Sequence, residues 1–304
     1  MAFTAHFLPQ ASSFQHFSPS QNFLPTMFPF RPHYKKQIAR IEIQGAIASA
    51  TRKRVLEALK EVEERKFPAL LLRIDSPGGT VGDSYEIYSA LKRLQTKGCK
   101  MVASFGNISA SGGVFIGVAA QHIMANPGTI TGSIGVILRG NNLERLLDRV
   151  GVSFKVIKSG PYKDILSFDR ELTEPEQQIL QDLIDTSYEQ FVQVVAEGRK
   201  LAPDAVKQFA DGRIFTGEQA LELGLIDRLG TEEDARRWAA ELAGLDPEKA
   251  KVFRFEEPKP LLSRITGSQS NLKPWVKVPA LQTGIDWLEF ELETQGMPLW
   301  LYRP

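Results

Sequence analysis

Between residues 38 and 160, segments with the pattern of β-strands alternate with segments that have the period of α-helices. The run at 69–74 is continuously apolar, as expected of a strand that is buried on both faces. Strands that alternate with helices form a largely parallel sheet with helices on its faces, so we predict an α/β fold. The predicted strands lie at 38–43, 69–74, 101–105, 122–125 and 154–159, and the predicted helices between them at 51–65, 80–95, 109–120 and 142–150.

After residue 160 the pattern is mainly helical. A long helix is predicted from Thr173 to about Lys200, because its first residues, Thr-Glu-Pro-Glu, form a capping box with a proline in the first turn. Shorter helices are predicted near 203–210, 217–223 and 231–243. The alternating part and this helical part together predict one folded domain at 38–257.

The two ends of the 304-residue chain differ from this domain. Residues 1–37 contain five prolines, seven phenylalanines and no acidic residue, and we predict that they form a disordered tail. Met27 is an alternative start, because the residues after it lead directly into the first strand. Residues 258–304 are predicted to form a C-terminal tail whose tryptophans dock on the domain, on a neighbouring subunit or on a membrane surface.

Composition excludes several classes of protein. The 37 Lys and Arg residues balance 36 Asp and Glu, which argues against a nucleic-acid partner. The single cysteine, Cys99, excludes an internal disulfide and a Cys-rich zinc site. No run approaches the roughly 18 consecutive apolar residues of a membrane span. We therefore predict a protein without metal or cofactor, in the cytoplasm or peripherally associated with a membrane.

Three glycine-rich turns, each after a predicted strand, are candidates for chemistry: 75–79, 109–113 and 129–135. In the second turn, Ser111 precedes Gly112 and Gly113 at the start of a helix. The helix dipole favours negative charge there, and the amide of Gly112 is free to bind an anion. A serine nucleophile needs an exposed hydroxyl with such a donor beside it, although Ser-Gly-Gly turns also serve backbone geometry alone.

A serine nucleophile also needs a base. His122 is the one histidine in the predicted domain, and no carboxylate in the sequence marks it as the base. A lysine can take this role if burial keeps it neutral, because desolvation disfavours the charged amine. Lys163 is a candidate, since it lies in a Gly-Pro loop after the predicted strand at 154–159.

Four blocks of sequence together resemble the signal peptide peptidase A family of bacterial Ser/Lys peptidases. The resemblance covers about residues 38–257 and keeps the order and spacing of the blocks, which are LLLRIDSPGGTV, ISASGGVFIGVAAQHIMANPGTITGSIGVI, FKVIKSGPYKD and ADGRIFTGEQALELGLIDRLG. It implies the fold that this family shares with the Clp protease proteolytic subunit and the crotonases.

The resemblance also implies roles for individual residues. Ser111 would be the nucleophile and Lys163 the general base. The amides of Gly79 and Gly112 would form the oxyanion hole, and Ser133 would orient the lysine.

The activity that the resemblance implies is that of a serine endopeptidase. Its substrates would be cleaved signal peptides or other short hydrophobic peptides, degraded at or near the membrane. Relatives carry an N-terminal membrane anchor, which this sequence lacks, and short relatives assemble into homo-oligomeric rings. The two alternatives are a crotonase-like acyl-CoA enzyme and a catalytically inactive scaffold or regulatory homologue. Both are weakened because Ser111 and Lys163 are present together.

Overall fold

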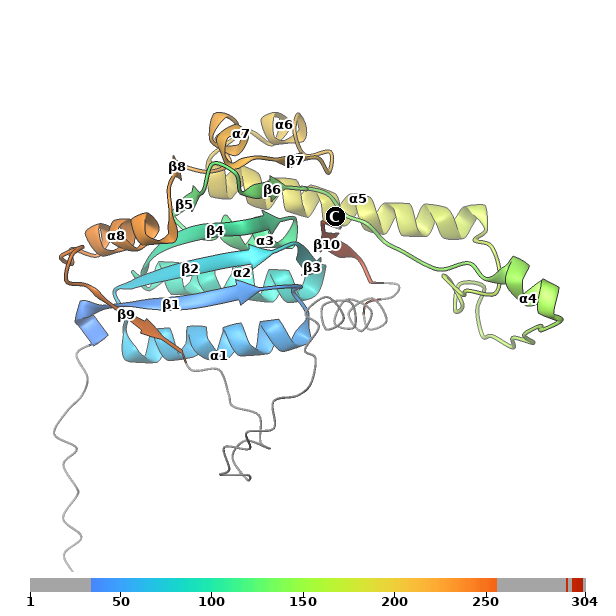
Figure 1. The fold of residues 1–304 in the computed structure, drawn as a ribbon. Coiled ribbons are helices and arrows are strands. Elements are labelled where there is room, and N and C mark those ends of the chain that lie inside the picture. The colour runs from blue at the N-terminus through green and yellow to red at the C-terminus, as the bar shows by residue number, and fades with distance from the viewer. Residues whose placement is uncertain (1–33, 256–293, 295–296, 303–304) are drawn as a thin grey trace, which may run out of the picture. The chain divides into compact units, whose positions relative to one another are not determined.

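The computed structural model describes residues 34–255, 294 and 297–302. Its centre is a sheet with strands in the order β7-β6-β4-β2-β1-β9, in which β5 pairs with both β4 and β8 (Figure 1). All pairs in this sheet are parallel except β6 with β7. The strands are β1 (Gln37–Gln44), β2 (Ala69–Ser76), β4 (Lys100–Ala110), β5 (His122–Ala125), β6 (Ile130–Gly132), β7 (Ile214–Phe215), β8 (Arg228–Leu229) and β9 (Lys251–Arg254).

Helices cover both faces of this sheet, which confirms the predicted α/β fold. Leu70 and Leu72 of β2 belong to the core that also contains buried residues of α1 (Ser49–Arg65), α2 (Val81–Thr96) and α3 (Gly112–Gly117). Leu71, which points to the other face, packs with α8 (Glu232–Leu242). Because the central strands are buried on both faces, their sequences are continuously apolar rather than alternating.

The helical part predicted after residue 160 is also present. It consists of α5 (Glu174–Arg199), α6 (Pro203–Lys207) and α7 (Gly217–Glu222), followed by α8. The predicted capping box of α5 is confirmed: the Glu176 amide donates to the Thr173 hydroxyl, and the Thr173 amide donates to the Glu176 carboxylate at 2.9 Å. These paired bonds satisfy amides that the helix leaves free at its start.

Residues 138–172, which we call the projecting segment, carry α4 (Glu144–Val150) away from the sheet (Figure 1). The strand predicted at 154–159 is wrong, because these residues have no strand partner and are exposed. Phe154 and Val156 are about half exposed and Ile157 is 93% exposed. Their apolar pattern is that of a strand, but the segment does not enter the sheet.

The chain ends are only partly described, and the alternative start at Met27 lies outside the described residues. In the tail predicted at 1–37, Tyr34–Lys36 form a 3-10 turn and Gln37 begins β1. This part of the prediction is wrong because the Tyr34 ring packs 5.1 Å from Phe67. In the predicted C-terminal tail, β10 (Leu299–Leu301) pairs antiparallel with β3 (Gly78–Thr80) of the domain.

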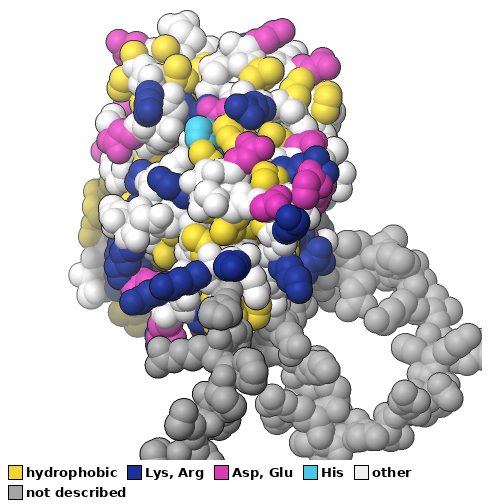
Figure 2. Space-filling view, turned by 90° about the vertical axis from the view of Figure 1, so that its left-hand side faces the viewer, with side chains coloured by type: hydrophobic (Ala, Val, Ile, Leu, Met, Phe, Trp, Pro, Cys, Tyr) yellow, Lys and Arg dark blue, Asp and Glu magenta, His cyan; other side chains and the backbone are white. Residues whose placement is uncertain are grey.

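Acidic and basic side chains lie side by side on the face shown in Figure 2, as the balanced composition suggests. Elsewhere in the described residues, ion pairs join Arg40 to Glu232 and Arg236 to Glu233. In the part of the chain that the structure describes, no helix is both long and apolar enough to cross a bilayer.

Candidate active site

The corner between β4 and α3 holds Ser111 in an uncommon backbone conformation. Its φ is +52° and its ψ is −115°, a combination that residues with a side chain rarely adopt. The Ser111 amide donates to the carbonyl oxygen of Gly132 at 2.8 Å, which ties the corner to the end of β6. Non-glycine residues kept in such strained conformations cluster at functional sites.

The hydroxyl of Ser111 is buried without a hydrogen-bond partner among the described residues. Ser111 is 1% exposed, and the Oγ atoms of Ser84 and Ser109 are also buried and unpartnered. A buried hydroxyl without a partner costs stability, so such groups are rare in native proteins. The Ser111 Oγ is therefore not committed to any hydrogen bond within the described residues, but it is buried and not exposed as the sequence analysis expects of a nucleophile.

Gly79 and Gly112 bring two backbone amides together beside Ser111. A Cβ atom on Gly112 would lie 3.2 Å from the Gly79 nitrogen, and one on Gly78 would lie 2.8 Å from the Gly112 nitrogen. Gly78 has a φ of +106°, a value that glycine adopts without strain. An oxyanion hole needs two amide donors beside a serine hydroxyl, and these two amides lie close together at the Ser111 corner.

Ser133 lies beside Ser111 because of the pairing between β4 and β6. Ala110 of β4 pairs with Gly132 of β6, and the two strands are parallel. The residues that follow this pair, Ser111 and Ser133, are therefore neighbours. Ser133 also has a positive φ, +50°, and its amide donates to the carbonyl oxygen of Arg213 at 2.7 Å. Four of the five predicted site residues thus meet at one end of the sheet.

Lys163, the fifth, is not brought to Ser111 within the chain. It is exposed and lies in the turn 161–166 of the projecting segment, and its amine makes no hydrogen bond or ion pair with the rest of the described chain. The next residue, Asp164, is fixed by hydrogen bonds from Arg170 and Lys158, which lower the pKa of its carboxyl well below the usual range. Lys163 therefore stands on an anchored turn, with its side chain toward solvent.

His122 lies at the opposite end of the sheet. It pairs with Val102, nine positions before Ser111 along β4, and at roughly 3.3 Å per residue it lies about 30 Å from that serine. Its Nδ1 is 4.0 Å from Asp227, a carboxylate partner that the sequence did not reveal, and its ring stacks on Trp238. Burial lowers the pKa of His122. His122 cannot serve Ser111 of the same chain.

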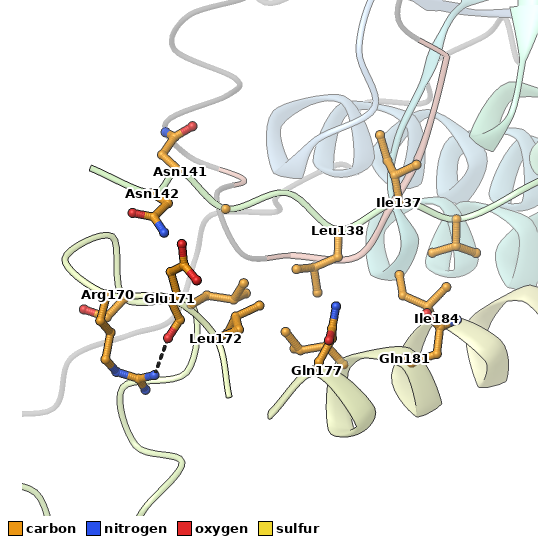
Figure 3. Close-up of a pocket in the computed structure, with 15 residues that line it drawn as sticks. Ile137, Leu138, Asn141, Asn142, Arg170, Glu171, Leu172, Gln177, Gln181 and Ile184 are labelled. Carbon is orange, nitrogen blue, oxygen red and sulfur yellow. Dashed lines mark hydrogen bonds between the residues drawn. The ribbon is translucent and has the colours of Figure 1, made fainter. Parts of the chain in front are cut away.

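A cavity of about 580 Å³ lies between the projecting segment and α5 (Figure 3). Ile137 and Leu138 line it from one side, Leu172 from the loop before α5, and Gln177 and Ile184 from α5 itself. None of the five predicted site residues lines this cavity. Among the described residues, no group of three or more His, Cys, Asp or Glu side chains could hold a metal ion.

The sequence was compared with known proteins. The profile described as peptidase family S49 matches residues 93–246, which include Ser111, Gly112, Ser133 and Lys163. A Synechocystis protein named as a protease, slr0021, is 69% identical over 91% of this chain and all of its own.

An Enterococcus faecium protein named as signal peptide peptidase SppA is 37% identical over 66% of this chain, and the match spans 62% of that relative. Among solved structures, a ClpP1 mutant from Listeria monocytogenes is similar with a TM-score of 0.47 and 16% identity, over 66% of this chain and 95% of that one. The resemblance to the signal peptide peptidase A family is confirmed, and the chain belongs to peptidase family S49.

Proposed function

We propose that the protein is a serine endopeptidase in which Ser111 is the nucleophile and Lys163 the general base. The observation that carries this proposal is the Ser111 hydroxyl, which is buried and unpartnered at a strained corner, beside the neighbouring amides of Gly79 and Gly112. A crotonase-like enzyme would need the two amides but no buried serine hydroxyl. A scaffold would need neither.

The reaction is an acyl transfer. Neutral Lys163 removes the proton of the Ser111 hydroxyl, and the oxygen attacks the carbonyl carbon of a peptide bond. The amides of Gly79 and Gly112 donate to the resulting oxyanion. The C–N bond then breaks as Lys163 returns the proton to the leaving amine, and a water activated by Lys163 hydrolyses the acyl-enzyme. Ser133 orients the lysine in this scheme.

Lys163 reaches this site from a neighbouring copy of the chain. On one chain its amine is exposed, whereas a lysine base has to be desolvated to be neutral near pH 7. The projecting segment that carries it exposes several apolar side chains, among them Phe154, Ile157 and Tyr162. Burying them against a second copy would remove apolar surface from water and desolvate the lysine. A homo-oligomeric ring is the closed assembly that such head-to-tail contacts build.

The substrates that fit are extended peptides with apolar side chains, including cleaved signal peptides. An extended peptide gains affinity from backbone hydrogen bonds to a strand edge, and its alternate side chains enter pockets. The strand β3, which contains Gly79, supplies such an edge at the site.

Active-site labelling tests the proposal. A fluorophosphonate probe should label the wild-type protein, and labelling should be lost in Ser111→Ala and fall by about 100- to 10,000-fold in rate in Lys163→Ala. His122→Ala serves as the matched control and should be labelled like the wild type. Undiminished peptide cleavage by Lys163→Ala would exclude this lysine as the base. A product released from acyl-CoA instead of from peptides would favour the crotonase-like alternative.

A further inference from the structure

Strand β10 of the C-terminal part is held on both of its edges at the candidate active site. On one edge it pairs antiparallel with β3, with Trp300 opposite Gly79. On the other edge, Leu299 exchanges two backbone hydrogen bonds with Ile137, at 2.9 and 3.1 Å. Ile137 lies four residues after Ser133, where the chain enters the projecting segment. The strand therefore lies between two segments that are close in sequence to the site residues Gly79 and Ser133.

The register of this pairing places the carbonyl group of Trp300 at the amide of Gly79. Val81 donates to the carbonyl oxygen of Pro298 at 3.3 Å, and Tyr302 donates to that of Pro77 at 2.6 Å. Hydrogen-bonded pairs alternate in an antiparallel ladder, so Trp300 and Gly79 are the hydrogen-bonded pair between these two.

The Gly79 amide thus faces the carbonyl oxygen of Trp300. A Cβ atom on Gly112 would lie 3.1 Å from the same oxygen. The carbonyl oxygen of Trp300 therefore lies close to Gly79 and Gly112, the two residues whose amides bind the oxyanion in the proposed reaction.

The side chain of Trp300 fills an apolar pocket. It is fully buried, with its ring stacked 3.9 Å from Phe115 of α3 and tilted 5.0 Å from Phe191 of α5. Its Nε1 has no hydrogen-bond partner among the described residues. The pocket thus recognises the size and apolar surface of the ring and not the indole N–H, which suits a phenylalanine as well.

We propose that β10 is a built-in competitor for the substrate groove. It lies in the groove as a peptide substrate does, and it excludes other peptides while it is paired. The pocket that Trp300 fills then selects a large aromatic side chain on the residue whose carbonyl is attacked. The class of substrate is an extended peptide with such a residue. The claim about the attacked residue rests on the proposed function of Ser111. The claim that β10 occupies the substrate groove rests on the strand pairing alone.

Removing the competitor tests its effect on catalysis. A chain that ends at Gly296 should cleave a fluorogenic peptide with Phe before the scissile bond with a kcat/KM on the order of tenfold or more above that of the full chain, because a tethered competitor acts at a high effective concentration. Trp300→Ala should also raise kcat/KM, whereas Trp300→Phe should keep the low kcat/KM of the full chain. The matched control is Met297→Ala, since Met297 is 46% exposed and precedes the strand.

The pocket should also determine the substrate preference of the chain that ends at Gly296. A peptide with Phe before the scissile bond should be cleaved faster than a matched peptide with Lys at that position. Equal rates would overturn the assigned pocket. If the truncation and Trp300→Ala lower the melting temperature without raising kcat/KM, β10 is only a structural strand and the proposal fails.

A binding measurement separates this inference from the proposed function. A fluorescein-labelled peptide with the sequence of residues 296–304, GMPLWLYRP, should bind a Ser111→Ala chain that ends at Gly296 and not the full-length Ser111→Ala chain. The same peptide with alanine in place of the tryptophan should bind at least about tenfold more weakly, because its apolar ring contact is lost.

The possible outcomes are distinct. Binding to neither chain, or to both equally, overturns the competitor. Binding to the truncated chain alone, without labelling of Ser111 or turnover by any variant with Ser111 intact, supports the competitor and overturns the peptidase. Should the truncated chain not fold, Leu299→Pro in the full chain removes the hydrogen bond that the Leu299 amide donates to the Ile137 carbonyl and should likewise let the labelled peptide bind.

Discussion

At the scale of single residues, the effect of adding a side chain to a glycine depends on the neighbours that the fold brings to it. Gly112 has the Ser84 hydroxyl 2.8 Å and the Gly79 amide 3.2 Å from the position of a Cβ atom, whereas a Cβ on Gly82 would meet nothing within 4 Å. Both lie in the first turn of a helix. Only the neighbours that the fold supplies make one of them essential to the geometry of the amides.

We expect Gly112→Ala to lower kcat by on the order of 100-fold, because the methyl group displaces one of the two oxyanion donors. Gly82→Ala is the matched control, and its kcat should be unchanged. Steady-state kinetics on one fluorogenic peptide measures both, and circular dichroism melts verify that each variant is folded. Equal kcat values for the two variants would exclude the Gly112 amide from the oxyanion hole.

At the scale of elements, helix α5 begins with a charge cluster that fixes the base of the projecting segment. Arg170 donates to both Asp164 and Glu176, and Glu176 also accepts from the Thr173 amide. The capping box was predictable because its residues are three positions apart. Arg170 was not, because nothing in the sequence says that a loop folds back on the helix that follows it.

The same cluster predicts a pH dependence of stability. The hydrogen bonds from Arg170 and Thr173 lower the pKa of Glu176 from 4.5 to about 2. A carboxyl with a depressed pKa in the folded state contributes stability that is fully present above its unfolded pKa and is lost as pH falls through its folded pKa. Glu176→Gln should therefore lower the free energy of unfolding above pH 4.5, and its difference from the wild type should shrink toward pH 2.

Urea denaturation at pH 7, 4.5 and 3 measures this difference. Glu174→Gln, in the first helical turn but exposed, is the control and should have a small effect. The variant and the wild type could instead differ in free energy of unfolding by the same amount at each pH. That result would mean that the Glu176 carboxylate gains no stability from its hydrogen bonds with Arg170 and Thr173.

At the scale of the whole molecule, the sheet holds Ser111, Gly79, Gly112 and Ser133 at one place and leaves Lys163 on the projecting segment. If Lys163 is the base, a complete site therefore needs a second copy of the chain. The exposed apolar side chains around Phe154 and Ile157 provide a reason for copies to associate.

Mixing two inactive variants tests this arrangement. Ser111→Ala and Lys163→Ala should each be inactive, and subunits co-assembled from both should recover activity. In a random equal mixture about a quarter of the sites would combine an intact serine with a neighbour's intact lysine. Activity of the co-assembled sample relative to wild type measures the recovery. No recovery, in subunits shown by mass spectrometry to have mixed, would place the lysine within one chain.

The sequence alone determined the features that depend on near neighbours in the chain. The alternation of strands and helices, the corner at Ser111 and the capping box at Thr173 each depend on residues a few positions apart, where periodicity and turn chemistry act. Tertiary structure alone decided which distant segments meet. Tertiary structure pairs Trp300 with Gly79 and His122 with Asp227, and it keeps Lys163 away from Ser111. The two residues in each of these cases are from 52 to 221 positions apart in the chain. Such contacts follow from the packing of whole elements, which leaves no periodic trace in the sequence.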